Sequence, residues 1–283
     1  SRHRSDTAPA PSKTPFQAKL SHGNSANPMS SSTPEINHPD HWLSDWPWPS
    51  EDSHKHKRGA LGVVTGSAAS TGAARLAARA GLRIGAGLVT LFSPPSATLV
   101  NAAHETSIMV KAFNSAEALS TLADTCTCAL IGPAAGVSDA TRDNTLTILA
   151  KAGSAILDAD ALTVFKDAPE NLFDAIKHPT VMTPHDGEFG RIFPGLLDQH
   201  SRPEAVAIAA ARSGAIVLLK GNETLIAAPD GRLVANRHAS PFLATAGSGD
   251  VLAGIISGLM AQGMDAFKAA CAAAWCHGEV ARR

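Results

Sequence analysis

From Ala60 onward, the chain alternates short runs of almost uniformly apolar residues with longer segments that have the period of a helix. Short runs of this kind are typical of strands that are buried on both faces of a sheet. The predicted strands cover Ala60–Thr65, Leu88–Phe92, Ala129–Ile131, Ala155–Leu157, Thr180–Met182 and Ile216–Leu219. The alternation predicts an α/β domain, with a mainly parallel central sheet and helices on both of its faces.

A helix and a hairpin can be placed within this alternation. Residues 72–83 have a helical pattern, with Leu76, Ala80 and Ile84 in the predicted apolar stripe. The runs Thr224–Ala227 and Leu233–Ala235 flank a Pro-Asp-Gly turn sequence, which predicts one antiparallel hairpin. Ligands of such sheets bind beyond the carboxyl ends of the strands, so the loops that follow the predicted strands are the candidates for chemistry.

The first part of the chain has a different character. Residues 1–53 are rich in Pro, Ser and Asn, and almost no periodic apolar face can be drawn through them. We therefore interpret them as a mostly irregular linker or tail, whose tryptophans pack onto the surface of the domain. Residues 54–283 are predicted to form that single domain.

Composition and charge narrow the class of protein. The 24 basic and 25 acidic residues nearly balance, which argues against binding to nucleic acid or to a membrane surface. The four cysteines are too few for a disulfide framework, and their spacings fit no zinc site. These features favour free thiols in the reducing cytoplasm.

The strongest candidate for chemistry is the loop Thr245–Asp250, which leads into an apolar helix. Gly247, Ser248 and Gly249 would let backbone N–H groups surround an anion at the positive end of that helix. Asp250 follows them, and an aspartate at a helix start is most often a simple cap. Because glycines flank it and no other acid is near in the sequence, we favour a carboxylate that accepts a proton from a hydroxyl attacking a phosphate.

Other segments after strands give weaker signals. The turn Lys220–Thr224 offers a cation and polar donors for the phosphate or ribose of a nucleotide, and His185 lies where a ligand could contact it. For Asp158 and Asp160, a helix cap and a solvated acid are the favoured interpretation. The glycine-containing segment 66–72 lacks the Lys of a P-loop and is interpreted as a tight connection. No metal ligands are predicted.

Taken in order, these segments resemble the ADP/ATP-dependent NAD(P)H-hydrate dehydratases, a branch of the ribokinase-like superfamily. The resemblance spans about residues 54 to 283. It is carried by His56-Lys57-x-Gly59-x-x-Gly62, Gly72-Ala73-Ala74, Gly85-Ala86-Gly87-Leu88-Val89, Ile131-Gly132-Pro133, Leu157-Asp158-Ala159-Asp160-Ala161-Leu162, Thr183-Pro184-His185-x-Gly187-Glu188-Phe189, Lys220-Gly221-Asn222-x-Thr224 and Gly249-Asp250.

The resemblance implies a ribokinase-like three-layer fold and a repair reaction. ADP or ATP would phosphorylate the hydroxyl of hydrated NADH or NADPH (the S epimer), and loss of phosphate would restore the reduced dinucleotide. ADP is the implied donor, and Mg2+ would accompany its phosphates. By matching positions, the adenine nucleotide would contact Lys220, Gly221, Asn222, Glu223, Thr224 and Gly249. The hydrate would face Ala73, Gly136, His185 and Asp250.

The resemblance also implies a context, and two alternatives stay open. The chain stops at Arg283, where family members continue into a closing helix, so we expect a truncated C-terminus. We expect a homo-oligomer, and a fusion to an NAD(P)H-hydrate epimerase domain in the full-length protein. One alternative is a vitamin-precursor or sugar kinase of the same superfamily. The other is an inactive nucleotide-binding fragment, since several loops depart from the family pattern.

Overall fold

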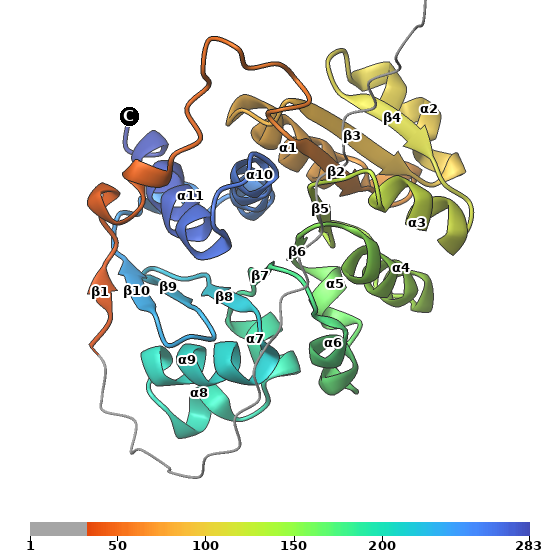
Figure 1. Cartoon of the computed structure of the whole chain (residues 1–283). Coiled ribbons are helices and arrows are strands. Elements are labelled where there is room, and N and C mark those ends of the chain that lie inside the picture. Colours follow the sequence, from red (N-terminus) through yellow and green to blue (C-terminus); the bar gives the residue numbers. More distant parts are fainter. Residues whose placement is uncertain (1–32) are drawn as a thin grey trace, which may run out of the picture. The chain divides into compact units, whose positions relative to one another are not determined.

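The structure, a computed structural model, describes residues 33–283 and contains one mixed sheet flanked by helices (Figure 1). The ten strands lie in the order β1-β10-β9-β8-β7-β6-β5-β2-β3-β4. Within residues 33–283, β9 alone runs antiparallel to both of its neighbours. The strands are β1 (Glu35–Ile36), β2 (Ala60–Val64), β3 (Leu88–Ser93), β4 (Met109–Ala112), β5 (Cys128–Ile131), β6 (Ala155–Leu157), β7 (Thr180–Met182), β8 (Ile216–Leu219), β9 (Thr224–Ala227) and β10 (Leu233–Asn236).

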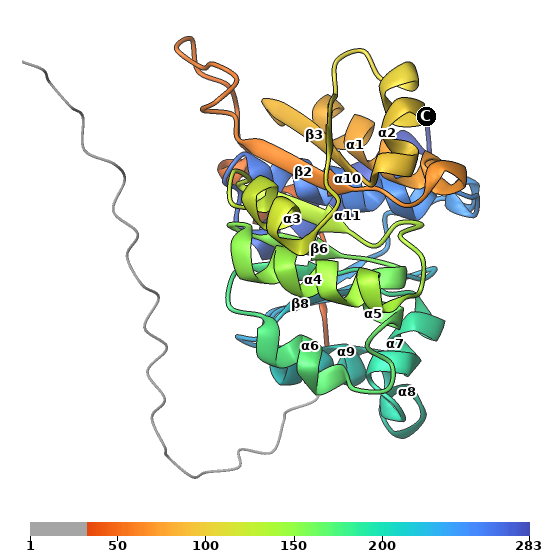
Figure 2. The same ribbon diagram turned by 90° about the vertical axis from the view of Figure 1, so that its right-hand side faces the viewer.

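Helices cover both faces of this sheet (Figure 2). One face carries α1, α10 and α11, and the other carries α3, α4, α6 and α9. Among the described residues, no helix combines the length and apolarity needed to cross a bilayer. The α-helices are α1 (Gly72–Arg83), α2 (Pro95–His104), α3 (Ala116–Ala123), α4 (Asp139–Lys151), α5 (Asp160–Thr163), α6 (Pro169–Ala175), α7 (Asp186–Ile192), α8 (Leu196–Gln199), α9 (Arg202–Ser213), α10 (Ser248–Ala261) and α11 (Ala266–Val280).

Most of the elements predicted from the hydrophobic pattern are present. The mainly parallel sheet with helices on both faces is confirmed, and so is the antiparallel β9–β10 hairpin. The two strands that the pattern did not predict both lie at edges of the sheet. Strand β1 has only two residues, and β4 is largely exposed, so neither produces a buried apolar run.

The predicted apolar stripe of α1 is wrong. The buried residues of this helix are all small, and Leu76 is 42% exposed. The buried face consists of Ala74, Ala77, Ala78 and Gly81. Small side chains are needed on this face because α10 packs directly against it.

Helices α1 and α10 pack so closely that glycines of α10 lie directly against the backbone of α1. A Cβ on Gly254 would lie 2.2 Å from the carbonyl oxygen of Ala77, and a Cβ on Gly258 would lie 2.6 Å from that of Gly81. A Cβ on Gly81 would in turn approach the side chain of Leu61 to 2.4 Å. Since real Cβ atoms do not tolerate such distances to backbone atoms, glycine is required at positions 254 and 258.

Part of the expected tail is attached to the domain. Residues 33–283 belong to one compact unit, and β1 pairs with β10. Trp42 is only 2% exposed, and its indole N–H donates to Asn37 at 3.2 Å. The amide of Asn37 donates to Asn236 at the end of β10 and to the backbone of Cys271 in α11. Residues 1–32 of the expected tail lie outside the described residues.

The glycine contact predicts a large effect of a single methyl group. Gly254→Ala should lower the free energy of unfolding by roughly 1–3 kcal/mol, because the Cβ overlaps the backbone of α1. Gly190→Ala is the matched control, since a Cβ there meets open space within α7. That variant should gain about 0.5 kcal/mol from the better helix propensity of alanine. Urea unfolding followed by circular dichroism measures both, and equal effects would contradict this description of the contact.

The attachment of the tail predicts a contrast between two tryptophans. Trp42→Ala should cost about 3–5 kcal/mol, because a large buried side chain and its hydrogen bond are lost. Trp48 is 70% exposed, so Trp48→Ala should change the free energy of unfolding by no more than about 0.5 kcal/mol. The same unfolding measurement decides. A stability of Trp42→Ala close to that of the unmodified chain would show that residues 35–48 do not support the domain.

Candidate active site

The candidate site lies at the carboxyl ends of the central strands. Asp158 directly follows β6, and Lys220 directly follows β8. Both strands are neighbours of β7, so their carboxyl ends meet at one edge of the sheet. The N-terminus of α10 reaches the same place, since Lys220 Nζ lies 3.6 Å from the position that a Cβ on Gly249 would occupy.

The start of α10 has the geometry of an anion-binding site. Gly247 is the cap, with a φ of 87° that favours glycine, and a Cβ there would lie 2.7 Å from the side chain of Leu76. The backbone N–H of Val251 donates to the carbonyl of Gly247 at 3.0 Å. The backbone N–H groups of Gly249 and Asp250 come before the first hydrogen bond of the helix, so they have no acceptor within it. They are therefore free to donate to a negatively charged group at the positive end of the helix.

Asp250 lies in the first turn of α10 and is partly buried. Burial raises the pKa of this carboxyl group, and the negative charge of Asp158 raises it further. The ammonium group of Lys220 acts in the opposite direction. A raised pKa makes the carboxylate a stronger base, which suits it to accept a proton from a hydroxyl.

Lys220 makes an ion pair below the anion-binding loop. Its Nζ donates to Asp158 Oδ1 at 2.9 Å, and Glu188 Oε2 lies 3.7 Å away. The interpretation of Asp158 and Asp160 as a helix cap and a solvated acid is wrong, since Asp158 is 2% exposed and Ala159 is the cap residue of α5. The carboxylate of Asp160 accepts the backbone N–H of Gly136 at 2.8 Å. The sequence did not reveal the ion pair because its two members are 62 residues apart.

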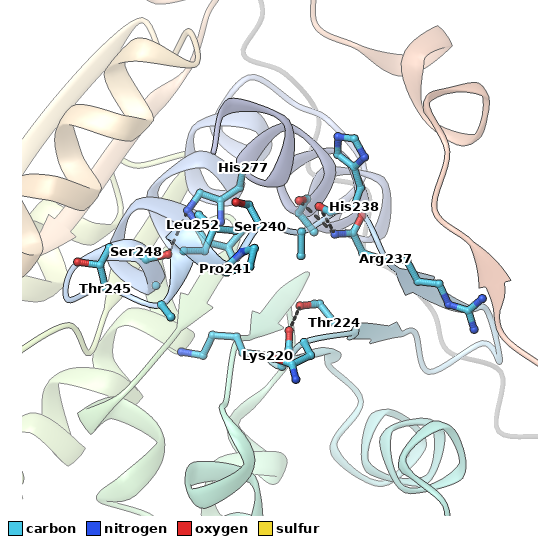
Figure 3. Close-up of a pocket in the computed structure, with 18 of the residues that line it drawn as sticks. Lys220, Thr224, Arg237, His238, Ser240, Pro241, Thr245, Ser248, Leu252 and His277 are labelled. Atoms are coloured by element: carbon cyan, nitrogen blue, oxygen red, sulfur yellow. Dashed lines mark hydrogen bonds between the residues drawn. The ribbon is translucent and has the colours of Figure 1, made fainter. Parts of the chain in front are cut away.

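A cavity of about 910 Å³ opens beside this charged group. Lys220 and Thr224 lie across it from Ser248, Leu252 and His277 (Figure 3). Of the residues predicted to bind the nucleotide, the cavity is lined by Lys220, Gly221, Asn222, Thr224 and Gly249. Glu223 is not among the lining residues, since its carboxylate pairs with Arg237.

The residues predicted to face the hydrate lie around the same edge of the sheet but do not line the cavity. Ala73 is in the first turn of α1 and is partly buried. Gly136 follows β5 with a φ of 87°. His185 caps α7, where its Nδ1 accepts the N–H groups of Gly187 and Glu188 at 2.9 and 3.3 Å. Its side chain is 55% exposed, so the ring remains open to a ligand.

The sequence did not predict the far wall of the cavity. This wall is the segment 236–241. The side chain of Asn236 accepts from that of Asn37 in the tail and donates to the backbone carbonyl of Ala274 in α11. The ring of His238 stacks on that of Trp275, with 4.6 Å between the ring centroids. The Nε2 atom of His238 lies 2.7 Å from Glu279 Oε2. His277 Nε2 lies 3.4 Å from the hydroxyl of Ser248, and burial lowers its pKa. No local pattern identifies such residues, because their roles depend on contacts across the domain.

The described residues contain no group of three or more His, Cys, Asp or Glu side chains that could hold a metal ion. Mg2+ commonly binds through one or two carboxylates together with substrate phosphates and water. The site is therefore compatible with a magnesium ion that arrives with a nucleotide, whose phosphate oxygens would supply most of the ligands.

Comparison with known proteins places this site in a family. Residues 61–283 match the NAD(P)H-hydrate dehydratase family. The chain is 39% identical over 238 residues to the ADP-dependent (S)-NAD(P)H-hydrate dehydratase of Neisseria meningitidis, covering 82% of this chain and 79% of that protein. It is 35% identical to the bifunctional NAD(P)H-hydrate repair enzyme of Salinibacter ruber, covering 84% of this chain and 46% of that protein. The chain therefore spans about half the length of that bifunctional relative.

Solved structures agree with this assignment. The ADP/ATP-dependent NAD(P)H-hydrate dehydratase of Bacillus subtilis, crystallised with ATP and Mg2+, superposes with a TM-score of 0.76 at 27% identity. That match covers 88% of this chain and 89% of the other. A ribokinase-like superfamily protein of Enterococcus faecalis gives a TM-score of 0.77 at 24% identity over 92% of this chain and 89% of the other, which confirms the fold. The chain has the ribokinase-like fold and belongs to the NAD(P)H-hydrate dehydratase family.

Proposed function

We propose that this chain uses ADP to convert the S epimer of hydrated NADH or NADPH back to the reduced dinucleotide. The observation that carries the proposal is the position of Asp250, a partly buried carboxylate of raised pKa beside the free amides of α10. A base next to an anion-binding helix end is what transfer of a phosphoryl group to a hydroxyl requires. The names of the relatives supply the substrate class.

The cavity beside Lys220 is the proposed nucleotide site. Its volume of about 910 Å³ lies within the range of small-molecule sites. The turn between β8 and β9 would contact the nucleotide through Lys220, Gly221, Asn222, Glu223 and Thr224, with Gly249 opposite. Because Glu223 pairs with Arg237, its side chain would reach the ligand only from the rim of the cavity.

In the proposed reaction, the hydroxyl of the hydrate attacks the terminal phosphoryl group of ADP, and AMP leaves. Asp250 takes the hydroxyl proton, and the backbone amides of Gly249 and Asp250 stabilise the charge on the phosphoryl group during transfer. The phosphate then leaves the ring carbon, a proton is lost from the adjacent carbon, and the ring double bond forms. This sequence makes the protein a carbon–oxygen lyase.

The hydrate would bind on the side of Asp250 that faces the ends of β2 and β5. Ala73 and Gly136 carry little or no side chain there, which lets a flat ring approach the backbone. The exposed ring of His185 would provide the polar contact. Mg2+ bound with the donor phosphates would neutralise part of their charge, and the protein would contribute Lys220 on the same side.

The remaining expectations are part of the proposal. We favour ADP over ATP as donor because the relative from Neisseria meningitidis is named for it. The bifunctional relatives support a fusion to an epimerase domain in the full-length protein. A homo-oligomer in the cytoplasm, and residues 54–283 as the catalytic domain, remain predictions.

Asp250→Asn tests this function. Turnover of the hydrate should fall roughly 100- to 10,000-fold, because the amide cannot accept the hydroxyl proton. ADP binding measured by calorimetry should persist, since the amides of α10 and Lys220 are unchanged. Asp198→Asn, an exposed carboxylate in α8, is the matched control and should keep full turnover.

Turnover is followed as recovery of the absorbance of the reduced nicotinamide. Turnover that survives Asp250→Asn would remove the carboxylate from the role of base. A stable phosphorylated product without recovery of the dinucleotide would support the kinase alternative. ADP binding with no turnover of the hydrate, whichever donor is supplied, would support the inactive fragment.

A further inference from the structure

Asp158 is a buried carboxylate that the proposed chemistry does not use. Its side chain is 3% exposed, and Lys220 is its partner at 2.9 Å. Removing a carboxylate from water costs several kcal/mol in general, so a buried ion pair is stable only where the surrounding structure holds both groups in a good geometry. The backbone supplies one, since the N–H of Asp158 donates to Ile131 at 3.2 Å and its carbonyl accepts from Ala161 at 3.1 Å.

The loop around Asp158 fits closely. A Cβ on Gly132 would lie 1.7 Å from the carbonyl oxygen of Asp158, so the ends of β5 and β6 touch through their backbones. The next residue, Ala159, has a φ of 49°, a value that is uncommon for a residue with a side chain. The carboxylate is therefore held by a constrained loop, whereas the side chain of Lys220 has four rotatable bonds.

The ammonium group of Lys220 connects Asp158 with the anion-binding loop. It lies 2.9 Å from Asp158 and 3.6 Å from the position of a Cβ on Gly249. An unanchored lysine would lose up to about 2 kcal/mol of side-chain entropy on taking one position. The ion pair fixes that position before a ligand binds.

We propose that Asp158 is a positioning residue, which holds the Lys220 ammonium group at the N-terminus of α10 and keeps a fixed negative charge beside Asp250. The inference extends the proposed function, because it assigns a role toward the proposed base. Fixed charges around a reacting group need not reorganise during the reaction, which is how such sites stabilise transferred charge.

The charges around Asp250 determine the direction of the expected effect. Asp158 raises the pKa of Asp250 and Lys220 lowers it, while burial is the largest influence. Removing the charge of Asp158 should therefore lower the pKa of Asp250, because Lys220, although less firmly held, still has Glu188 Oε2 3.7 Å away to keep its positive charge near the site. Other titratable or charged groups on the elements around the site include the cap residue His185 with Asp186 and Glu188 of α7, Asp160 of α5, Arg202 of α9, Arg75 of α1 and His277 of α11.

The test compares Asp158→Asn with Asp158→Glu in the full chain. Carbon-13 NMR follows the titration of the Asp250 carboxyl group in the absence of nucleotide and hydrate. In Asp158→Asn the midpoint should move to lower pH, because the neighbouring negative charge is lost. In Asp158→Glu it should stay near that of the unmodified chain, because the charge is kept. Asp198→Asn is the control for loss of a distant charge and should show no shift.

A second measurement follows Lys220 itself. The nitrogen-15 signal of its ammonium group should be protected from solvent exchange in the unmodified chain and lost in Asp158→Asn. Equal shifts of the Asp250 midpoint in both Asp158 variants would show loosened packing and overturn the proposal. Rapid exchange at Lys220 in the unmodified chain would overturn it as well, and this readout needs no variant to fold.

Activity separates this inference from the proposed function. If both hold, the acid limb of the turnover rate moves to lower pH in Asp158→Asn and stays in place in Asp158→Glu. If the chain does not turn over the hydrate, the two NMR measurements still confirm or overturn the placement of charge around Asp250.

Discussion

Helices α1 and α10 approach each other so closely that the backbone of one lies where side chains of the other would be. Gly254 and Gly258 leave no room for a Cβ against α1, and Gly81 faces them. This contact sets the position of α10 on the sheet, and with it the position of the loop that begins the helix. Leu76 of α1 also abuts Gly247, so the start of α10 is fixed by the same neighbour. A small shift of α10 would separate its amides from the strand ends where Asp158 and Lys220 lie.

The site assembled there combines opposite charges at short range. The free amides and Lys220 attract an anion, while Asp158 and Asp250 would repel it. Asp250 is the base of the proposed chemistry, and Asp158 is the proposed positioning residue for Lys220. The raised pKa of Asp250 brings the base closer to the working pH, which makes proton transfer more favourable. The two carboxylates therefore weaken the attraction of the site for the anionic donor, while the raised pKa makes Asp250 a stronger base.

The sequence predicts those parts of the structure that depend on neighbours along the chain. The buried central strands, the β9–β10 hairpin and the glycine loop before α10 are all encoded in short segments. The apolar stripe of α1 was wrong because the period alone does not show that a neighbouring helix requires small residues. Asp158 was wrongly interpreted because its partner lies 62 residues away.

The far wall of the cavity was also not predicted, because it depends on contacts between residues that are distant in the sequence. Asn37, Asn236 and His277 come from three separate segments, and only the fold brings them to one place. The pattern of residues 33–53 predicted a tail whose tryptophans pack onto the domain, as Trp42 does, but it held no apolar run or spacing to show which residues they contact. Local patterns predicted the separate segments, and only the resemblance to a family, which rests on motifs in a fixed order, predicted that these segments form one site.

The central claim is that the start of α10 transfers a phosphoryl group to the hydrate and that elimination follows. The most direct test supplies the purified hydrate with ADP or with ATP and quantifies every product by chromatography. With ADP we predict equal amounts of reduced dinucleotide, inorganic phosphate and AMP. With ATP the nucleotide product should be ADP in place of AMP, and ADP should be the better donor. Reduced dinucleotide formed without consumption of either nucleotide would contradict the account, because the anion-binding loop and Asp250 would then have no phosphoryl group to act on.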